Sequence, residues 1–329
     1  EETGFNYITS DERDELSGVC ADYLTEERDK PFFMVASFIN PHDICYMAIR
    51  DFGESDFDQL ILENGEVELA TLDKALQLPE GVDEKEFFAE YCPPLPDNFE
   101  PQENEPEAVQ KLLQIRKFRK KARENYSEKD WRRHRWAYCK LTERVDSQIE
   151  ELLKAVKENG LMEDTVIIFT SDHGDMDSSH RLEHKTVFYE EASRIPLIVY
   201  DPESERKGII EEHLVSNGLD LLPTLCDYAG ISPSGKVPGK SLKSLVQGKE
   251  SDSWREYVPV QNEVGYMIVT GRYKYMLFEE GENREQLMDL KKDPGEMKNF
   301  ASHPDYCKVL EKHRQLFKKE WPEKSDLLW

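Results

Sequence analysis

The sequence feature that most constrains the fold is a short apolar run that ends at a group of polar residues. Residues 165–170 are β-branched or aromatic, which is typical of a buried strand in a parallel sheet. The run stops at Ser171-Asp172-His173-Gly174. Ligand sites of open α/β sheets lie outside the carboxyl ends of the strands. We therefore expect Asp172 and His173 to border a ligand site, with Gly174 allowing a sharp turn beside them.

The side chains that follow this strand suit a cation and an anion. A carboxylate and an imidazole side by side are ligands for a hard or borderline divalent cation. Lys185 carries a compact ammonium group suited to an anionic oxygen. His180 and His184 are four residues apart and would suit zinc on a helix, but the Asp-Ser-Ser sequence before them favours a loop. From residue types alone, a metal and oxyanion site and a polar loop without chemistry are equal alternatives.

A second apolar run also ends in a polar loop. Residues 31–39 predict another strand, followed by Asn40-Pro41-His42-Asp43. His42 at that end is either a proton donor or anion ligand, or a turn histidine in solvent. Apolar spacing predicts helices over residues 10–30, 127–160 and 215–229, and a third strand over residues 195–200. Strands that alternate with helices in this way predict a doubly wound α/β fold.

The remaining segments predict an insertion and a C-terminal subdomain. Residues 50–110 are acidic and rich in prolines, which indicates an irregular surface insertion. Residues 111–123 are strongly basic, and a solvated helix face is favoured there over a nucleic-acid or membrane contact. Residues 257–260, 264–270 and 273–278 alternate like an antiparallel meander, and an amphipathic helix is expected over residues 304–321.

Composition excludes several classes of function. The chain has 329 residues and a net charge of −25, which disfavours nucleic-acid binding through phosphate contacts. An anionic substrate would need a local positive site, such as a metal ion. The sequence contains no apolar run of 18 residues, so no membrane span is expected. The six cysteines are scattered without a Cys-x-x-Cys pair, which argues against a structural zinc site or a disulfide scaffold.

The sequence from Ser171 to Ile198 resembles a signature region of a known enzyme family. Ser-Asp-His-Gly-Asp-Met is followed by His180, Lys185, Tyr-Glu-Glu and Arg-Ile-Pro-Leu-Ile, as in the sulfatases of the alkaline-phosphatase-like superfamily. Asn40-Pro41-His42 and the Gly-Arg-Tyr-Lys-Tyr sequence from Gly271 are similar to the family as well. The resemblance implies an α/β fold with a mostly parallel sheet flanked by helices. It implies a truncated α/β domain over residues 1–250, with an insertion at 50–125, and a smaller antiparallel α+β subdomain over 251–329.

The resemblance also assigns roles to residues. It implies that Asp172 and His173 bind a divalent cation, which is usually calcium in this family. Lys185 would contact the sulfate group, His180 matches a substrate-binding position, and His42 would lie on the leaving-group side. The implied activity is hydrolysis of sulfuric esters of a sulfated carbohydrate or small molecule, in a periplasmic, secreted or lysosomal setting.

Two family elements are not found in this sequence. Sulfatases use a formylglycine nucleophile made from a Cys/Ser-x-Pro-x-Arg motif, and a paired Asp-Asp that binds the same cation. Cys92-Pro93-Pro94 lacks the arginine. We therefore expect a fragment that lacks its nucleophile and is inactive alone. A phosphonate monoester or phosphodiester hydrolase, a non-catalytic glycan-binding relative, and an RNA-related role for the basic residues 111–123 remain as alternatives.

Overall fold

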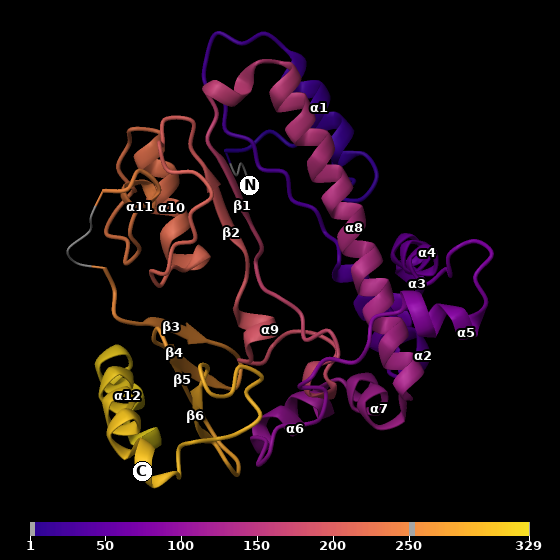
Figure 1. Ribbon diagram of the computed structural model, residues 1–329, viewed down its shortest axis with the longest axis vertical. Coiled ribbons are helices and arrows are strands. Elements are labelled where there is room, and N and C mark those ends of the chain that lie inside the picture. The colour runs from indigo at the N-terminus through magenta and orange to yellow at the C-terminus, as the bar shows by residue number, and fades with distance from the viewer. Residues whose placement is uncertain (1–3, 250–253, 329) are drawn as a thin grey trace. The chain divides into compact units, whose positions relative to one another are not determined.

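The computed structural model describes residues 4–249 and 254–328 of the chain, which form two compact units (Figure 1). The first unit consists of the residues up to Leu95 together with Lys117–Thr165. The second consists of Pro96–Arg116 and the residues from Val166 onward. The domain boundary expected between residues 250 and 251 lies outside the described residues.

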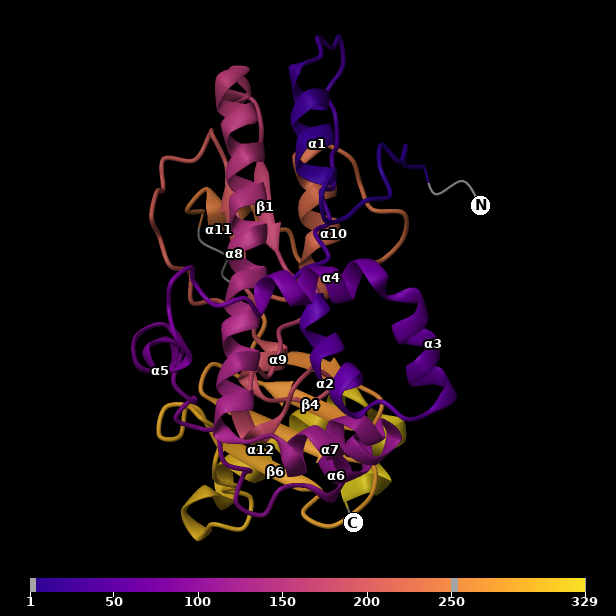
Figure 2. The same ribbon diagram turned by 90° about the vertical axis from the view of Figure 1, so that its right-hand side faces the viewer.

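The first unit is built from helices around one long helix. Its members are α1 (Leu16–Thr25), α2 (Cys45–Phe52), α3 (Asp56–Asn64), α4 (Glu66–Ala75), α5 (Glu84–Glu86), α7 (Lys117–Asn125) and α8 (Glu128–Glu158). Ser127 and Asp130 form a capping box that starts α8, and Gly160 with φ 69° follows its end. Figure 2 shows α1 alongside α8, and the two helices are in contact. The helices predicted over residues 10–30 and 127–160 are confirmed, the second as one continuous helix.

Apolar faces of these helices make the core of the first unit. One cluster joins residues of the 42–44 turn, α2, α4 and α8: Ile44, Met47, Leu72, Ala75, Ala137 and Leu141. A second cluster joins α2 and α7: Ala48, Ile49, Phe118 and Ala122. In residues 4–249 and 254–328, no helix is long and apolar enough to cross a bilayer.

Two expectations for the first unit are wrong. The acidic segment predicted as irregular contains α3 and α4, because Ser55 and Asp58 form a capping box and Leu72 anchors α4 in the core. The segment 31–39 is extended and alternates in exposure, but it is not a strand. The described residues give it no ladder partner, and Phe33 and Val35 are 58% and 59% exposed. A strand forms only where a neighbouring strand takes up its backbone hydrogen bonds.

The second unit contains a two-stranded ribbon and a four-stranded sheet. The ribbon pairs β1 (Ile167–Thr170) antiparallel with β2 (Leu197–Tyr200), which confirms strands at both predicted places. The helices of this unit are α6 (Glu107–Ile115), α9 (Glu190–Ser193), α10 (Asn217–Tyr228), α11 (Lys243–Val246) and α12 (Cys307–Glu320). Phe169 and Ile198 lie opposite each other across the ribbon and are 38% and 60% exposed. The other residues of the two strands are partly buried, so neither face of the ribbon is fully covered.

The C-terminal sheet is an antiparallel meander buried on both faces. Its order is β3 (Val258–Gln261), β4 (Gly265–Val269), β5 (Tyr273–Phe278) and β6 (Glu285–Asp289). The predicted meander and final helix are confirmed, and β6 is an additional strand that the sequence pattern missed. Figure 1 shows α12 beside the sheet, and Phe317 of α12 belongs to the same apolar cluster as Tyr275 and Leu287 of that face. The other face packs on Phe188 and Ala108 of the same unit.

We predict that Leu141→Ala lowers the free energy of unfolding by about 2–5 kcal/mol, because it leaves a cavity between α8, α4 and the 42–44 turn. Leu141 is 1% exposed. Leu153 lies on the same helix and is 44% exposed, so Leu153→Ala serves as the matched control, with a change within about 0.5 kcal/mol. Urea unfolding of both variants measures the difference. Equal effects would show that the buried face of α8 is assigned wrongly.

Candidate active site

β1 delivers a carboxylate and an imidazole to the same point. Asp172 and His173 directly follow the strand, and Asp172 Oδ2 lies 3.3 Å from His173 Nε2. The Asp172 side chain is 83% exposed and that of His173 is 39% exposed. The hydroxyl of Ser171 donates to the His173 carbonyl at 2.6 Å, which tightens the turn after the strand. Asp172 and His173 thus lie side by side after the strand, and their role as cation ligands stays a prediction.

The hydrogen bond made by Nδ1 of His173 determines whether Nε2, which faces Asp172, can act as a ligand. His173 Nδ1 lies 2.8 Å from the Gly174 carbonyl oxygen, which can only accept, so Nδ1 carries a proton. In the neutral imidazole, Nε2 then presents a lone pair toward the Asp172 oxygen. Two lone pairs that face each other at this distance repel unless a proton or a cation lies between them. Metal-binding histidines usually donate their other ring N–H to a carbonyl or a carboxylate, as Nδ1 of His173 does here.

Electrostatics keep the Asp172 carboxylate charged. The atoms around the carboxylate desolvate it in part, which raises its pKa, but the backbone N–H of His173 and the charge of Lys185 act the other way, and the pKa lies below its ordinary value. The N–H of His173 donates to Asp172 Oδ1 at 2.9 Å. Lys185 thus lies near enough to stabilise the carboxylate electrostatically.

These two donors fit a divalent cation only in part. An oxygen and a nitrogen that converge on one point match the donor preferences of calcium and similar ions. The described residues contain no group of three or more His, Cys, Asp or Glu side chains that could hold a metal ion. Asp172 and His173 are therefore two members of an incomplete ligand set.

The loop after Gly174 has an unusual backbone conformation. Several of its non-glycine residues have positive φ values: Asp177, Ser178, His180, Arg181, His184 and Thr186. Such conformations cost about 1–3 kcal/mol each and persist only where the surroundings impose them. Backbone hydrogen bonds do so here, from Met176 N–H to His184 O and from Ser178 N–H to Leu182 O. Met176 and Leu182 are buried against α6 and α9.

His180 lies inside this loop rather than on its surface. Its side chain is fully buried, and its ring stacks on Tyr189 with centroids 3.9 Å apart and planes at 13°. Its backbone N–H donates to the Asn98 carbonyl at 2.8 Å. The structure thus places the ring as a support between the loop and the residue before α9. Its assignment as a substrate contact stays a prediction.

The other two predicted residues differ in their surroundings. Lys185 is half-buried and lies eleven positions beyond Gly174 in the same loop. His42 belongs to the first unit, where it is exposed and begins the turn His42–Ile44. Its neighbour Asp43 is fully buried and paired with Arg13 at 2.8 Å, which anchors that turn. The roles of Lys185 and His42 stay predictions.

Sequence reasoning missed a residue that holds the strand end in place. Asn217, the first residue of α10, donates through Nδ2 to the Ser171 carbonyl at 2.8 Å and lies 3.4 Å from the Asp172 carbonyl. It attaches the start of α10 to the backbone that carries the site. The only sequence signal was its position at the start of a predicted helix, which gave no reason to link it with residues 171 and 172.

We predict that Gly174→Ala destabilises the second unit by about 1–3 kcal/mol, because a Cβ there would lie 1.9 Å from the Glu191 carbonyl oxygen. The clash would also disturb the hydrogen bond from Gly174 N–H to Ala192 O. A Cβ at Gly271 would meet no atom within 4 Å, so Gly271→Ala is the control. Chemical unfolding compares the two. A neutral effect of Gly174→Ala would mean that the loop does not approach α9 this closely.

Comparison with known families agrees with this arrangement. A family model described as Sulfatase matches residues 12–231, and one described as N-sulphoglucosamine sulphohydrolase, C-terminal, matches residues 178–321. The delta 4,5-hexuronate-2-O-sulfatase of Bacteroides thetaiotaomicron is 33% identical over 314 residues, covering 91% of this chain. The chain spans 59% of the length of that relative.

Solved structures share the fold. A 2-O GAG sulfatase superposes with a TM-score of 0.76 at 30% identity, covering 94% of this chain and 63% of the other. The phosphonate monoester hydrolase of Agrobacterium radiobacter superposes with a TM-score of 0.66 over 92% of this chain and 59% of its own, and its 23% identity indicates a common fold alone. The fold class expected from the sequence is confirmed, but the strands within the described residues pair antiparallel and not in the mostly parallel sheet expected. Because the Sulfatase model matches more than half of the residues, the chain belongs to the sulfatase family.

Proposed function

We propose that this chain carries the cation-binding and sulfate-binding part of an enzyme that hydrolyses sulfuric esters. The observation that carries the proposal is the convergence of Asp172 Oδ2 and His173 Nε2, 3.3 Å apart, at the end of β1. Lys185 follows in the same loop with its charge close enough to lower the pKa of Asp172. Membership in the sulfatase family supports the same reading.

The proposed chemistry divides among the residues as follows. A divalent cation held by Asp172 and His173 would supply positive charge to the non-bridging oxygens of a sulfuryl group. Lys185 would contact the same oxygens and stabilise the charge that gathers on them during transfer. His42, which is exposed, would protonate the leaving oxygen of the alcohol. His180 would position the loop that carries Lys185.

We assign no nucleophile to any residue of 1–329. No Cys/Ser-x-Pro-x-Arg sequence occurs in the chain. Without that motif the chain lacks the nucleophile that the family resemblance implies, so we expect no turnover by these residues alone. Binding, rather than hydrolysis, is therefore the activity to test on this chain.

The proposed substrate is a sulfated carbohydrate. Among the relatives, one is named for a hexuronate 2-O-sulfate and another is a 2-O GAG sulfatase. A sugar sulfate needs its leaving alkoxide protonated, which fits a histidine on the leaving-group side. We also propose a location outside the cytosol, which the family resemblance supports.

We predict that the chain binds calcium weakly, with a Kd of about 10⁻³ M, because calcium takes 6–8 oxygen ligands and only two donors converge here. Isothermal titration calorimetry measures this, with Asp172→Asn expected to abolish the signal. Asp305 is 86% exposed and far along the chain, so Asp305→Asn is the matched control and should bind as the wild type does. Equal binding by Asp172→Asn would refute the assignment, and micromolar binding would show that more ligands lie in this chain.

We predict that inorganic sulfate binds in the presence of calcium and that Lys185→Ala weakens this binding about tenfold, since a hydrogen bond to a charged group contributes about 1.5–3 kcal/mol. Lys308→Ala removes an exposed lysine of α12 and should change nothing. Titration with phosphate and methylphosphonate in parallel tests the alternative superfamily activity. Tighter binding of methylphosphonate than of sulfate would favour the phosphonate hydrolase reading over the sulfatase one.

A further inference from the structure

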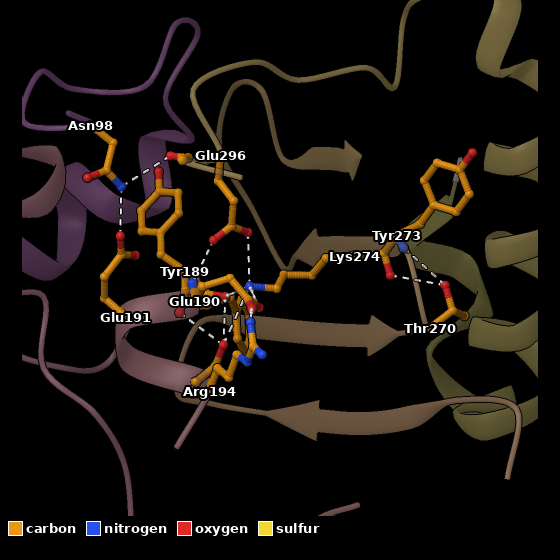
Figure 3. Close-up of polar contacts among 12 residues, drawn as sticks. Asn98, Tyr189, Glu190, Glu191, Arg194, Thr270, Tyr273, Lys274 and Glu296 are labelled. Carbon is orange, nitrogen blue, oxygen red and sulfur yellow. Dashed lines mark hydrogen bonds and ion pairs between the residues drawn. The ribbon is translucent and has the colours of Figure 1, made fainter. Parts of the chain in front are cut away.

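A lysine with no exposed surface lies in the middle of the C-terminal sheet. Lys274 of β5 is 0% exposed, although lysines are almost never fully buried unless they are paired. Its Nζ lies 2.8 Å from Glu190 Oε1 and 2.9 Å from Glu296 Oε1, and it donates to the Phe188 carbonyl at 2.9 Å. Figure 3 shows the ammonium group between the two carboxylates. The ammonium group thus donates a hydrogen bond to one carbonyl and lies at ion-pair distance from two carboxylate oxygens.

The pleat of β5 determines which way this lysine points. Alternate residues of a strand face opposite sides of the sheet. Tyr275 and Leu277 pack on the α12 side, whereas Met276 and Phe278 pack on the side of Phe188. Lys274 shares the second side, so its ammonium group meets the segment that leads into α9. A methionine-sized apolar residue would suit such a position, as at Met276.

The charges around Lys274 are nearly balanced. Glu296 is buried and Glu190 is 22% exposed, and Arg194, 81% exposed, lies 3.7 Å from the outer oxygen of Glu190. Burial raises the pKa of Glu296 to about 7, and Lys274 opposes that rise. Replacing a buried ion pair by apolar residues often costs nothing in stability. The burial of this ion pair is therefore weak evidence that it stabilises the fold. The contacts of Lys274 and Glu296 indicate a different role.

Those contacts lead to the candidate site. Glu296 Oε2 accepts the N–H of Glu190, the first residue of α9, at 2.6 Å. The neighbouring Tyr189 stacks on His180, and Ala192 accepts the N–H of Gly174 at 2.9 Å. The first contact joins α9 to Glu296, and the other two hold α9 and the residue before it against the loop that follows β1.

A second connection reinforces the first. Asn98 Nδ2 donates to Glu191 Oε1 at 2.7 Å and lies 3.3 Å from the Gly295 carbonyl, next to Glu296 (Figure 3). The carbonyl of Asn98 accepts the N–H of His180. The C-terminal sheet, α9 and the site loop are therefore joined by polar contacts at more than one point.

We propose that Lys274, together with Glu190 and Glu296, is a positioning residue of the candidate site: it holds α9 in the place that fixes Gly174 and His180. The inference deepens the proposed function and rests on it for the identity of the site. It assigns the C-terminal sheet a part in building that site, because removal of one buried ammonium group would release the loop that carries Lys185.

The test is hydrogen exchange of the whole chain, read by mass spectrometry over peptides that contain residues 174–180. We expect Lys274→Met to speed exchange there about tenfold or more, because the contacts to Phe188 and Glu190 are lost. The control is Arg314→Met, which breaks an ion pair between α12 and Glu285 of β6, on the α12 side of the same sheet. That variant should speed exchange around α12 and leave residues 174–180 unchanged.

A double variant tests whether Lys274 positions α9 or only neutralises the buried charge of Glu296. In Lys274→Met with Glu296→Gln, no uncompensated carboxylate is buried at 296, and the glutamine oxygen still accepts the N–H of Glu190. We expect the melting temperature to return most of the way to the wild-type value while exchange at 174–180 stays fast. Recovery of both would overturn the proposal, as would unchanged exchange at 174–180 in the single variant or a uniform increase throughout the unit. A wild-type chain that binds neither calcium nor sulfate would refute the proposed function and leave the exchange result standing.

Discussion

The arrangement of the candidate site depends on how closely the chain after β1 approaches α9. The N–H of Gly174 donates to the Ala192 carbonyl, and the α-carbon of Gly174 leaves no room for a side chain against Glu191. This contact fixes the direction in which the chain leaves β1. Asp172 and His173 lie just before it, so their convergence depends on it, as does the course of the strained loop to Lys185.

The contact with α9 is not maintained by apolar packing alone. α9 has four residues, too few to be a stable helix by itself, and its first turn is held by the buried carboxylate of Glu296. The Lys274 ammonium group then lies between Glu190 and Glu296. Polar groups buried in this way are costly unless each finds its partner. The network therefore favours one geometry of the loop over many loosely packed ones, which is what a ligand site requires.

Local patterns in the sequence predicted the parts of the fold that depend on neighbours in the chain. The apolar run before Asp172 and the helical spacing of apolar residues over 127–160 are of this kind, and both elements are present. The acidic helices α3 and α4 were missed because the acidic residues and prolines of residues 50–110 suggested an irregular segment. The strand β6 was missed because its sequence contains the polar residues Glu285 and Gln286, whose partners include the distant Arg314 and Gln102.

Only the part of the candidate site that consists of residues adjacent in sequence could be predicted. Asp172 and His173 are neighbours in sequence, and their pairing follows from the strand end. Asn98 contacts Gly295, 197 positions away, and Lys274 contacts Phe188, 86 positions away. No pattern within a single segment encodes such contacts, because a buried lysine and an exposed one look the same in sequence. The family resemblance included the Gly-Arg-Tyr-Lys-Tyr sequence from Gly271, which contains Lys274, but it assigned no role to that lysine.

The central claim is that Asp172 and His173 bind one cation together. Anomalous diffraction from crystals soaked in a manganese salt, as a substitute for calcium, tests it most directly. If both side chains bind one cation, a single anomalous peak is expected within about 2.6 Å of both Asp172 Oδ2 and His173 Nε2. A peak that contacts only one of the two side chains, or a peak elsewhere in the chain with none between them, would contradict it.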